Sequence, residues 1–224
     1  MESRKLVKTA IVVGATGLTG KHITNCLLES ADYAKVIVFS RRLVAIKHPK
    51  LCNHLIDFEK FEDWCDLLQS DDLFLALGTT KKQAGSKEAQ YRIDYTYQAN
   101  VIEAAAKNAV KRLFLVSSPQ ANINSSFFYP RMKGQLEEFA RKQHFKTLVF
   151  FKPTLIEGDR SDDRPMEKIG SSILHGLART IPIMKSYQPI LGSQLGRAIV
   201  NCASGQLSLG EYSFERAKIF DFCR

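Results

Sequence analysis

The sequence predicts a doubly wound α/β fold, in which helices cover both faces of a parallel sheet. Two observations carry this prediction. Short, almost continuous apolar runs alternate with longer segments of helical periodicity, as expected for strands buried on both faces. The first run, residues 11–13, stops at Gly14, and Gly17 and Gly20 follow at intervals of three residues. A strand, a glycine turn and a helix in this order are typical of sheets that bind a ligand beyond their strand ends.

The glycine turn suits an anionic ligand. Glycine has no Cβ, so the chain can turn sharply and come close to the ligand. The helix that follows offers unpaired N–H groups and the positive end of its dipole. We therefore expect Gly14, Gly17 and Gly20 to hold the pyrophosphate of a dinucleotide.

A helix and two strands are expected next along the chain. Leucine and isoleucine side chains within residues 18–29 recur near 3.6-residue spacing, which predicts a helix. The run Lys-Val-Ile-Val-Phe at residues 35–39 predicts the second strand. A shorter run at residues 54–58 predicts the third.

The middle of the chain repeats this alternation. Residues 61–68 predict a helix, and the run Leu-Phe-Leu-Ala-Leu at residues 73–77 predicts a strand that ends at Gly78. Residues 91–108 predict a long helix, because apolar side chains from Tyr95 to Ala106 follow one face.

Two further strands flank another helix. Residues 112–116 predict a strand that ends at Ser117, residues 129–142 a helix, and residues 147–151 the sixth strand. The order βαβαβαβαβαβ is that of a Rossmann-type sheet.

The pattern loosens after Lys152. The segment 157–165 is polar and predicts a loop, followed by helices at residues 166–180 and 193–203 and a weak strand at residues 211–214. We expect one domain over residues 1–224, in which residues from about 153 to 224 build a small substrate lobe over the carboxyl edge of the sheet.

Composition narrows the class of protein. The chain has 224 residues, and no apolar run approaches the ~18 residues that a membrane helix needs. The first five residues lead straight into a strand and leave no room for a secretory signal, so a cytoplasmic protein is expected. Five cysteines in no C-x-x-C spacing and five scattered histidines predict no metal site. A net charge of +9 is dispersed and accompanies no nucleic-acid motif, which favours anionic small ligands over a nucleic acid.

Polar residues at the strand ends indicate the cofactor. Arg41 and Arg42 follow the second strand, where NAD sites usually carry an acid for the ribose hydroxyls. Guanidinium groups suit a 2′-phosphate, so NADP(H) is expected rather than NAD. After the third strand, Asp57 could bond the adenine with Phe58 packed beside it, or both could be structural. Gly78 lets the backbone pass close to the nicotinamide ribose.

The pair Tyr129 and Lys133 is the expected catalytic pair. The two residues stand at i and i+4, on one face of a helix. A nearby ammonium and a positively charged nicotinamide would lower the pKa of a phenol, so Tyr129 could exchange a proton with a carbonyl or alcohol oxygen. A hydroxyl at the end of the fifth strand should hold that oxygen. Ser117 and Ser118 compete for this role with Ser125, and Ser118 is favoured.

The glycine motif, the serine pair after the fifth strand and Tyr129-x-x-x-Lys133 resemble the short-chain dehydrogenase/reductase superfamily in its atypical branch. The segments 76–80 and 125–129, with Asp159-Arg160 and Arg164-Pro165, resemble oxidoreductases of the Tat-interacting-protein type. This resemblance covers roughly residues 7–220. Pro119 departs from the expected pattern after the serine pair, which weakens the serine assignment.

The resemblance implies an NADP-binding Rossmann fold and assigns further cofactor contacts. It places Tyr129 as proton donor or acceptor with Lys133 as its partner, and Arg41 and Arg42 at the 2′-phosphate. By position it adds contacts in the glycine turn, on the ribose side and in the loop after the sixth strand: Thr16, Gly17, Leu18, Thr19, Leu77, Gly78, Ile156 and Arg164.

The expected function is therefore NADP(H)-dependent hydride transfer between nicotinamide and a small carbonyl or alcohol substrate. The alternative is an NADP(H)-sensing module that regulates a protein partner without turnover, since a fold and a cofactor do not guarantee catalysis. The alternative needs the glycine turn and the arginines, but does not need Tyr129 and Lys133.

Overall fold

A seven-stranded sheet, parallel throughout, forms the centre of the computed structural model, which describes residues 7–158, 189–205, 207–215 and 217–223. The strand order β3-β2-β1-β4-β5-β6-β9 confirms the predicted doubly wound fold. The order reverses between β1 and β4, which is where such sheets bind ligands. The strands are β1 (Lys8–Val13), β2 (Tyr33–Ser40), β3 (Leu51–Leu55), β4 (Asp72–Leu75), β5 (Arg112–Val116), β6 (Thr147–Lys152) and β9 (Gly210–Glu215).

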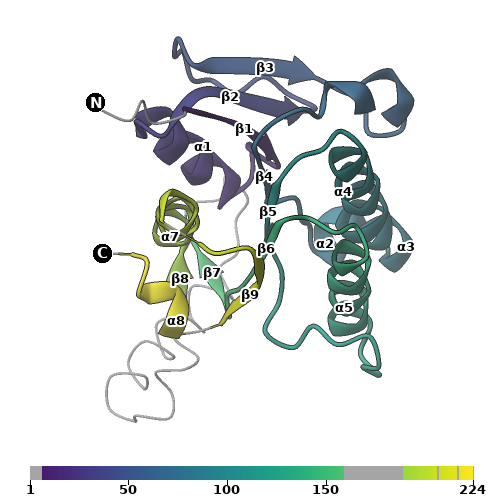
Figure 1. The fold of residues 1–224 in the computed structure, drawn as a ribbon. Coiled ribbons are helices and arrows are strands. Elements are labelled where there is room, and N and C mark those ends of the chain that lie inside the picture. Colours follow the sequence, from purple (N-terminus) through teal and green to yellow (C-terminus); the bar gives the residue numbers. More distant parts are fainter. Residues whose placement is uncertain (1–6, 159–188, 206, 216, 224) are drawn as a thin grey trace.

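Helices cover both faces of this sheet, as Figure 1 shows. On one side lie α1 (Gly20–Glu29) and α7 (Gly192–Ser204); on the other stand α4 (Tyr97–Lys107) and α5 (Phe128–Arg141). Alternate strand residues feed two separate cores, with Val12 in the core below α1 and Ile11 in the core below α4 and α5. This explains why the strands read as continuous apolar runs.

Short elements complete the chain. Thr80 and Ser86 cap two short helices, because their side chains accept hydrogen bonds from Gln83 N–H and Ala89 N–H. These elements are η1 (Phe61–Asp63), η2 (Cys65–Leu67), α2 (Lys81–Ala84), α3 (Lys87–Tyr91), the π-helical segment η3 (Arg92–Thr96), β7 (Ile156–Glu157), β8 (Ile190–Leu191) and α8 (Ala217–Phe220).

The third strand begins and ends three residues earlier than predicted. Leu51 to Leu55 pair with β2, whereas Phe58 leaves the ladder and stacks on Tyr97 at a ring separation of 5.0 Å. Phe58 is an apolar residue buried in an aromatic cluster, and the sequence pattern mistook this residue for the end of a strand. Similarly, the predicted helix at residues 61–68 consists of η1 and η2, because three-residue turns also bring Phe61 and Trp64 together.

The C-terminal part joins the main sheet. Residues 193–203 and 211–214 were predicted as a helix and a strand, and α7 and β9 contain them. Gly196 of α7 packs so closely on α1 that a Cβ would lie 2.7 Å from His22 Cβ. The predicted helix at residues 166–180, together with Arg164, lies outside the described residues, so the substrate lobe stays a prediction. Within the described ranges, none of the helices has the length and apolar character to cross a membrane.

Candidate functional site

The glycine turn joins β1 to α1 with almost no spare space. Gly14 has φ +95°, and a Cβ on it would lie 2.6 Å from the Ala76 carbonyl carbon. The Gly17 N–H donates to the Gly14 carbonyl at 2.9 Å and closes the turn. A Cβ on Gly20 would lie 2.1 Å from the same carbonyl oxygen. The first and third glycines are therefore required for α1 to start directly against the end of β1.

The turn presents unused hydrogen-bond donors. No hydrogen bond among the described residues uses the backbone N–H groups of Thr16, Leu18 or Thr19. The first turn of α1 carries no acidic side chain that would repel an anion. These donors and the helix dipole suit a pyrophosphate, so the residues present fit the expected dinucleotide.

Leu18 connects this turn to the chain after β6. Cβ atoms built on Gly158 and Gly192 would lie 2.5 Å and 2.9 Å from atoms of the Leu18 side chain. Ile156, which pairs with Ile190 between β7 and β8, therefore lies in a segment that packs on the glycine turn. This placement is compatible with the cofactor contact expected of Ile156.

Arg41 and Arg42 follow β2 directly and are exposed. The Ser40 hydroxyl donates to the Arg42 carbonyl at 2.5 Å and fixes the backbone between them. Neither guanidinium forms an ion pair with a residue in the described part of the chain, so both are available to an anion. Asp57 lies two residues beyond β3, where its carboxylate accepts the Glu59 N–H at 3.0 Å and caps a turn. An adenine contact for Asp57 stays a prediction.

Leu77 and Gly78 follow β4 beside the glycine turn. A Cβ on Gly14 would lie 2.7 Å from Leu77 N, which shows how closely the two strand ends approach. Asp94 holds the next residue of this segment, because its Oδ1 accepts the Thr79 N–H at 2.9 Å. A Cβ on Gly78 would lie 3.2 Å from that oxygen.

Tyr129 and Lys133 stand on α5 next to these strand ends. Lys133 is 4% exposed, and its Nζ donates to the Val116 carbonyl at the end of β5 at 3.4 Å. Burial lowers the pKa of Lys133, while the carboxylates of Asp94 and Glu137 raise it. Tyr129 is 39% exposed, so it is accessible to a ligand. Partial burial of its hydroxyl and the charge of Asp94 raise the pKa of Tyr129 to about 12, whereas the sequence argument expected Lys133 and a bound nicotinamide to lower it.

The three candidate serines differ in what their hydroxyls do. The Ser117 hydroxyl is buried and donates to Glu137, which also pairs with Lys152 at 3.1 Å. The Ser125 hydroxyl accepts the Phe127 N–H at 3.2 Å. The half-buried Ser118 hydroxyl makes no hydrogen bond within the described ranges. Ser118 is therefore the serine that remains available to a substrate oxygen.

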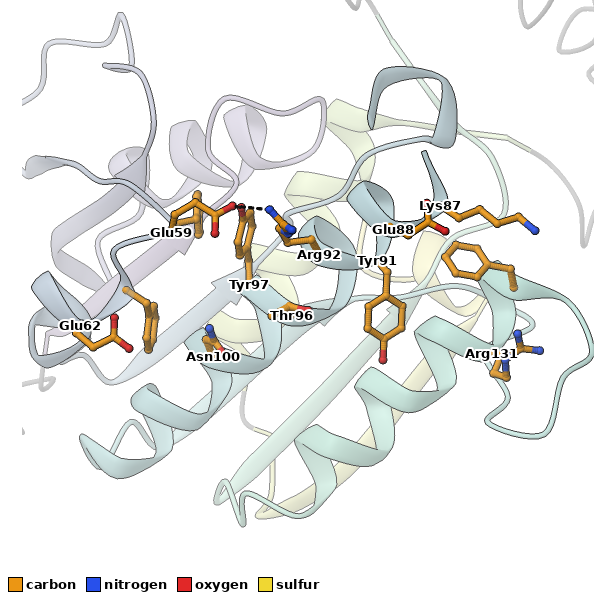
Figure 2. Close-up of a pocket in the computed structure, with 13 residues that line it drawn as sticks. Glu59, Glu62, Lys87, Glu88, Tyr91, Arg92, Thr96, Tyr97, Asn100 and Arg131 are labelled. Atoms are coloured by element: carbon orange, nitrogen blue, oxygen red, sulfur yellow. Dashed lines mark hydrogen bonds and ion pairs between the residues drawn. The ribbon is translucent and has the colours of Figure 1, made fainter. Parts of the chain in front are cut away.

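An open groove of about 900 Å³ lies outside this set of residues. Figure 2 shows Glu59, Arg92 and Tyr97 at one end, Arg131 at the other, and Tyr91 between them. Glu59 pairs with Arg92 at 3.2 Å and accepts a hydrogen bond from Tyr97. Of the residues expected to contact the cofactor or to exchange a proton, the groove contains Phe58 alone, which the sequence analysis placed beside the adenine.

Sequence reasoning missed Asp94, which the structure places between the Gly78–Thr79 backbone and Lys133. A signal was present: Asp94 is a charged residue next to Tyr95, where the apolar face of the predicted helix begins. Its burial to 1% exposure follows from the π-helical segment η3, which only the structure reveals.

Comparisons with known proteins agree with this geometry. Residues 10–149 match the NAD dependent epimerase/dehydratase family. The chain is 33% identical over 205 residues to Protein FMP52, mitochondrial, of Candida glabrata, covering 88% of this chain and 85% of that protein. It is 28% identical over 214 residues to Protein HTATIP2 of Rattus norvegicus, covering 91% and 86%. The predicted resemblance to oxidoreductases of the Tat-interacting-protein type is confirmed.

The fold is also similar to a solved structure. The crystal structure of the Bordetella bronchiseptica enzyme WbmH in complex with NAD⁺ matches with a TM-score of 0.69 and 18% sequence identity. The match covers 93% of this chain and 76% of that chain. The likeness confirms the Rossmann-type architecture.

One expectation from the sequence is wrong. The first five residues, which lead straight into a strand, led to the expectation of a cytoplasmic protein, but FMP52 relatives from Candida glabrata and Aspergillus niger are named as mitochondrial. A test for a secretory signal does not address import into mitochondria, which uses a different kind of leader. The names of these relatives therefore contradict the expectation of a cytoplasmic protein.

Proposed function

The chain belongs to the NAD dependent epimerase/dehydratase family, and from this premise we propose that it is an NADP(H)-dependent oxidoreductase that reduces a small carbonyl compound. The observation that carries the proposal is the placement of Tyr129 and Lys133 on one face of α5 beside the end of β5. A sensing module would need the glycine turn and Arg41 and Arg42, but not this pair.

The chain's own residues divide the work of such a reaction. The N–H groups of the glycine turn bind the pyrophosphate, and Arg41 and Arg42 bind the 2′-phosphate, which favours NADP(H) over NAD(H). When bound, NADP(H) supplies or accepts the hydride. Ser118 orients the substrate oxygen by a hydrogen bond.

Tyr129 handles the proton. A pKa of about 12 keeps its phenol protonated at neutral pH, which suits donation to a carbonyl oxygen that gains negative charge. The buried ammonium of Lys133, held at the Val116 carbonyl, stabilises the tyrosinate left after the transfer. The protonated phenol is therefore the form that reduction of a carbonyl uses.

The experiment that tests this proposal compares two tyrosine variants. Tyr129→Phe should bind NADPH as the wild type does, but should reduce a broad carbonyl panel about 10²- to 10⁴-fold more slowly. Tyr91→Phe is the matched control, because Tyr91 lies in the separate groove and its hydroxyl meets Gln135 at 3.3 Å. Full activity of Tyr129→Phe would refute the mechanism. NADPH binding without turnover in the wild-type protein would favour the sensing alternative.

The relatives also suggest where the protein acts. Since Protein FMP52 of Candida glabrata is named as mitochondrial, we place this chain in mitochondria. Fractionation of cells that express it with a C-terminal tag should recover it with mitochondrial markers. Recovery with cytosolic markers alone would contradict this placement.

A further inference from the structure

Asp94 is a buried carboxylate whose second oxygen accepts no hydrogen bond from the described part of the chain. The residue is 1% exposed, Oδ1 accepts the Thr79 N–H at 2.9 Å, and Oδ2 has no hydrogen-bond partner among the residues that the structure describes. Buried carboxylate oxygens are costly to leave unpaired, so this arrangement calls for an explanation. The Gln98 amide donates to the Asp94 backbone carbonyl at 2.8 Å and not to the carboxylate. The Gln90 amide donates to the Thr79 carbonyl at 3.4 Å and also lies close enough to the Asp94 carboxylate to favour its charged form.

The groups that face Asp94 belong to the proposed active site. The charge of Asp94 acts on Lys133 and Tyr129, which belong to α5. Asp94 also interacts with Gln90 of α3 and with the Thr79 N–H, which follows β4. In the described part of the chain, Asp94 and Lys133 do not form a direct ion pair. The carboxylate therefore acts on the pair through its charge.

We propose that Asp94 is a positioning residue: its Oδ1 fixes the Gly78–Thr79 backbone, and its buried carboxylate acts through its charge on Tyr129 and Lys133 of α5. The inference deepens the proposed function and rests on it for its significance. It gives Asp94 two separable tasks, because the charge acts towards α5 while the hydrogen bond acts towards the end of β4.

The sign of the charge effect follows from the structure. Burial raises the pKa of Asp94, while Lys133, the Thr79 N–H and Gln90 lower it. A negative Asp94 disfavours a tyrosinate at position 129 and favours an ammonium at position 133. Removing that charge should lower the pKa values of both groups, with Glu137 left as the carboxylate that faces Lys133.

The variant Asp94→Asn separates the two tasks. An asparagine Oδ1 can still accept the Thr79 N–H, so the backbone support is kept and the charge is lost. The dissociation constant for NADPH should then stay within about twofold of the wild type. In contrast, Asp94→Leu removes the acceptor as well and should weaken NADPH binding at least about fivefold, since the Thr79 N–H loses its partner.

The decisive readout is the ionisation of Tyr129, followed by tyrosinate absorbance immediately after a pH jump. Subtracting the matching titration of a Tyr129→Phe protein isolates this one tyrosine. The wild-type midpoint should lie at about 12, and Asp94→Asn should lower it by about half a unit to one unit. Asp66→Asn, which removes an exposed carboxylate on η2, is the control and should leave the midpoint unchanged.

A midpoint in Asp94→Asn that is unchanged or higher overturns the inference, and this holds even if Asp94→Leu fails to fold. The titration needs neither NADPH nor substrate. A protein without turnover can therefore still show the shift, in which case the proposed function fails and the inference stands. If Tyr129→Phe loses turnover while the midpoint in Asp94→Asn is unchanged, the proposed function stands and the inference about Asp94 fails.

Discussion

Substituting Gly20 and Gly17 separately by alanine should distinguish tight packing from ligand binding within one turn. A Cβ on Gly20 would lie 2.1 Å from the Gly14 carbonyl oxygen, whereas ordinary contact begins at 3.4 Å. Backbone atoms would have to separate by 3.4 − 2.1 = 1.3 Å. At Gly17 the corresponding distance is 3.2 Å, so a shift of 3.4 − 3.2 = 0.2 Å is enough.

These distances set the expected magnitudes. Overpacking of this kind costs ~1–3 kcal/mol in the free energy of unfolding. The higher end applies to Gly20, because the atoms that a Cβ there would meet belong to the backbone and cannot rotate away as a side chain can. Alanine recovers up to ~1 kcal/mol of helix propensity, so the net loss is about 2 kcal/mol. For a domain of this length that lowers Tm by about 4–8 °C. Gly17→Ala should change Tm by less than about 2 °C.

Binding should show the opposite order. Gly17 lies between the unused N–H groups of Thr16 and Leu18, so a methyl group there obstructs the pyrophosphate. We expect Gly17→Ala to raise the dissociation constant for NADPH at least about tenfold. Thermal unfolding followed by circular dichroism and fluorescence titration with NADPH measure the two effects.

Gly205→Ala is the control for both. Its φ is −69°, and a Cβ there would approach no atom closer than 3.4 Å, so stability and binding should be unchanged. If Gly20→Ala melts at the wild-type temperature, or if Gly17→Ala is destabilised equally, the packing argument for this turn is wrong.

Three further predictions concern charge. Replacing Arg41 and Arg42 together by serine should weaken NADPH binding at least about tenfold and leave NADH binding unchanged; equal effects on both in fluorescence titrations would contradict the 2′-phosphate assignment. Asp72→Ala should cost about 3–5 kcal/mol in urea unfolding, because Asp72 is fully buried between Arg112 and Tyr33; a loss below about 1 kcal/mol would show that the network is not stabilising. Partial burial raises the pKa of Asp71, but the Thr9 N–H and Lys111 outweigh it and hold the pKa below its ordinary value of 3.8. The stability that Asp71 contributes is therefore present above pH 3.8 and is lost as the pH falls through the lower pKa of the folded state. Asp71→Asn should then make the free energy of unfolding less dependent on pH in acid. An unchanged dependence would contradict this.

Much of the candidate site was proposed from the sequence because its geometric requirements are local. The turn at Gly14 depends on a few consecutive residues, and the pairing of Tyr129 with Lys133 on one face of α5 follows from helix geometry alone. The bounds of β5 agree with the prediction residue by residue, since a continuous apolar run flanked by polar residues leaves little choice. Arg41 and Arg42 were found because the end of a parallel strand is a place that the sequence identifies.

What only the tertiary structure decided depends on partners distant in the chain. The sequence favoured Ser118 over Ser117 without a contact to separate them, and the structure supplies one: the Ser117 hydroxyl donates to Glu137, twenty residues away. Asp94 joins the candidate site because folding brings η3 against α5 and against the backbone that follows β4, where Asp94 accepts the Thr79 N–H. The glycine turn and the Tyr129–Lys133 pair were thus determined by local backbone geometry. The charge that acts on that pair was determined by packing between elements, for which spacing along a single chain carries no signal.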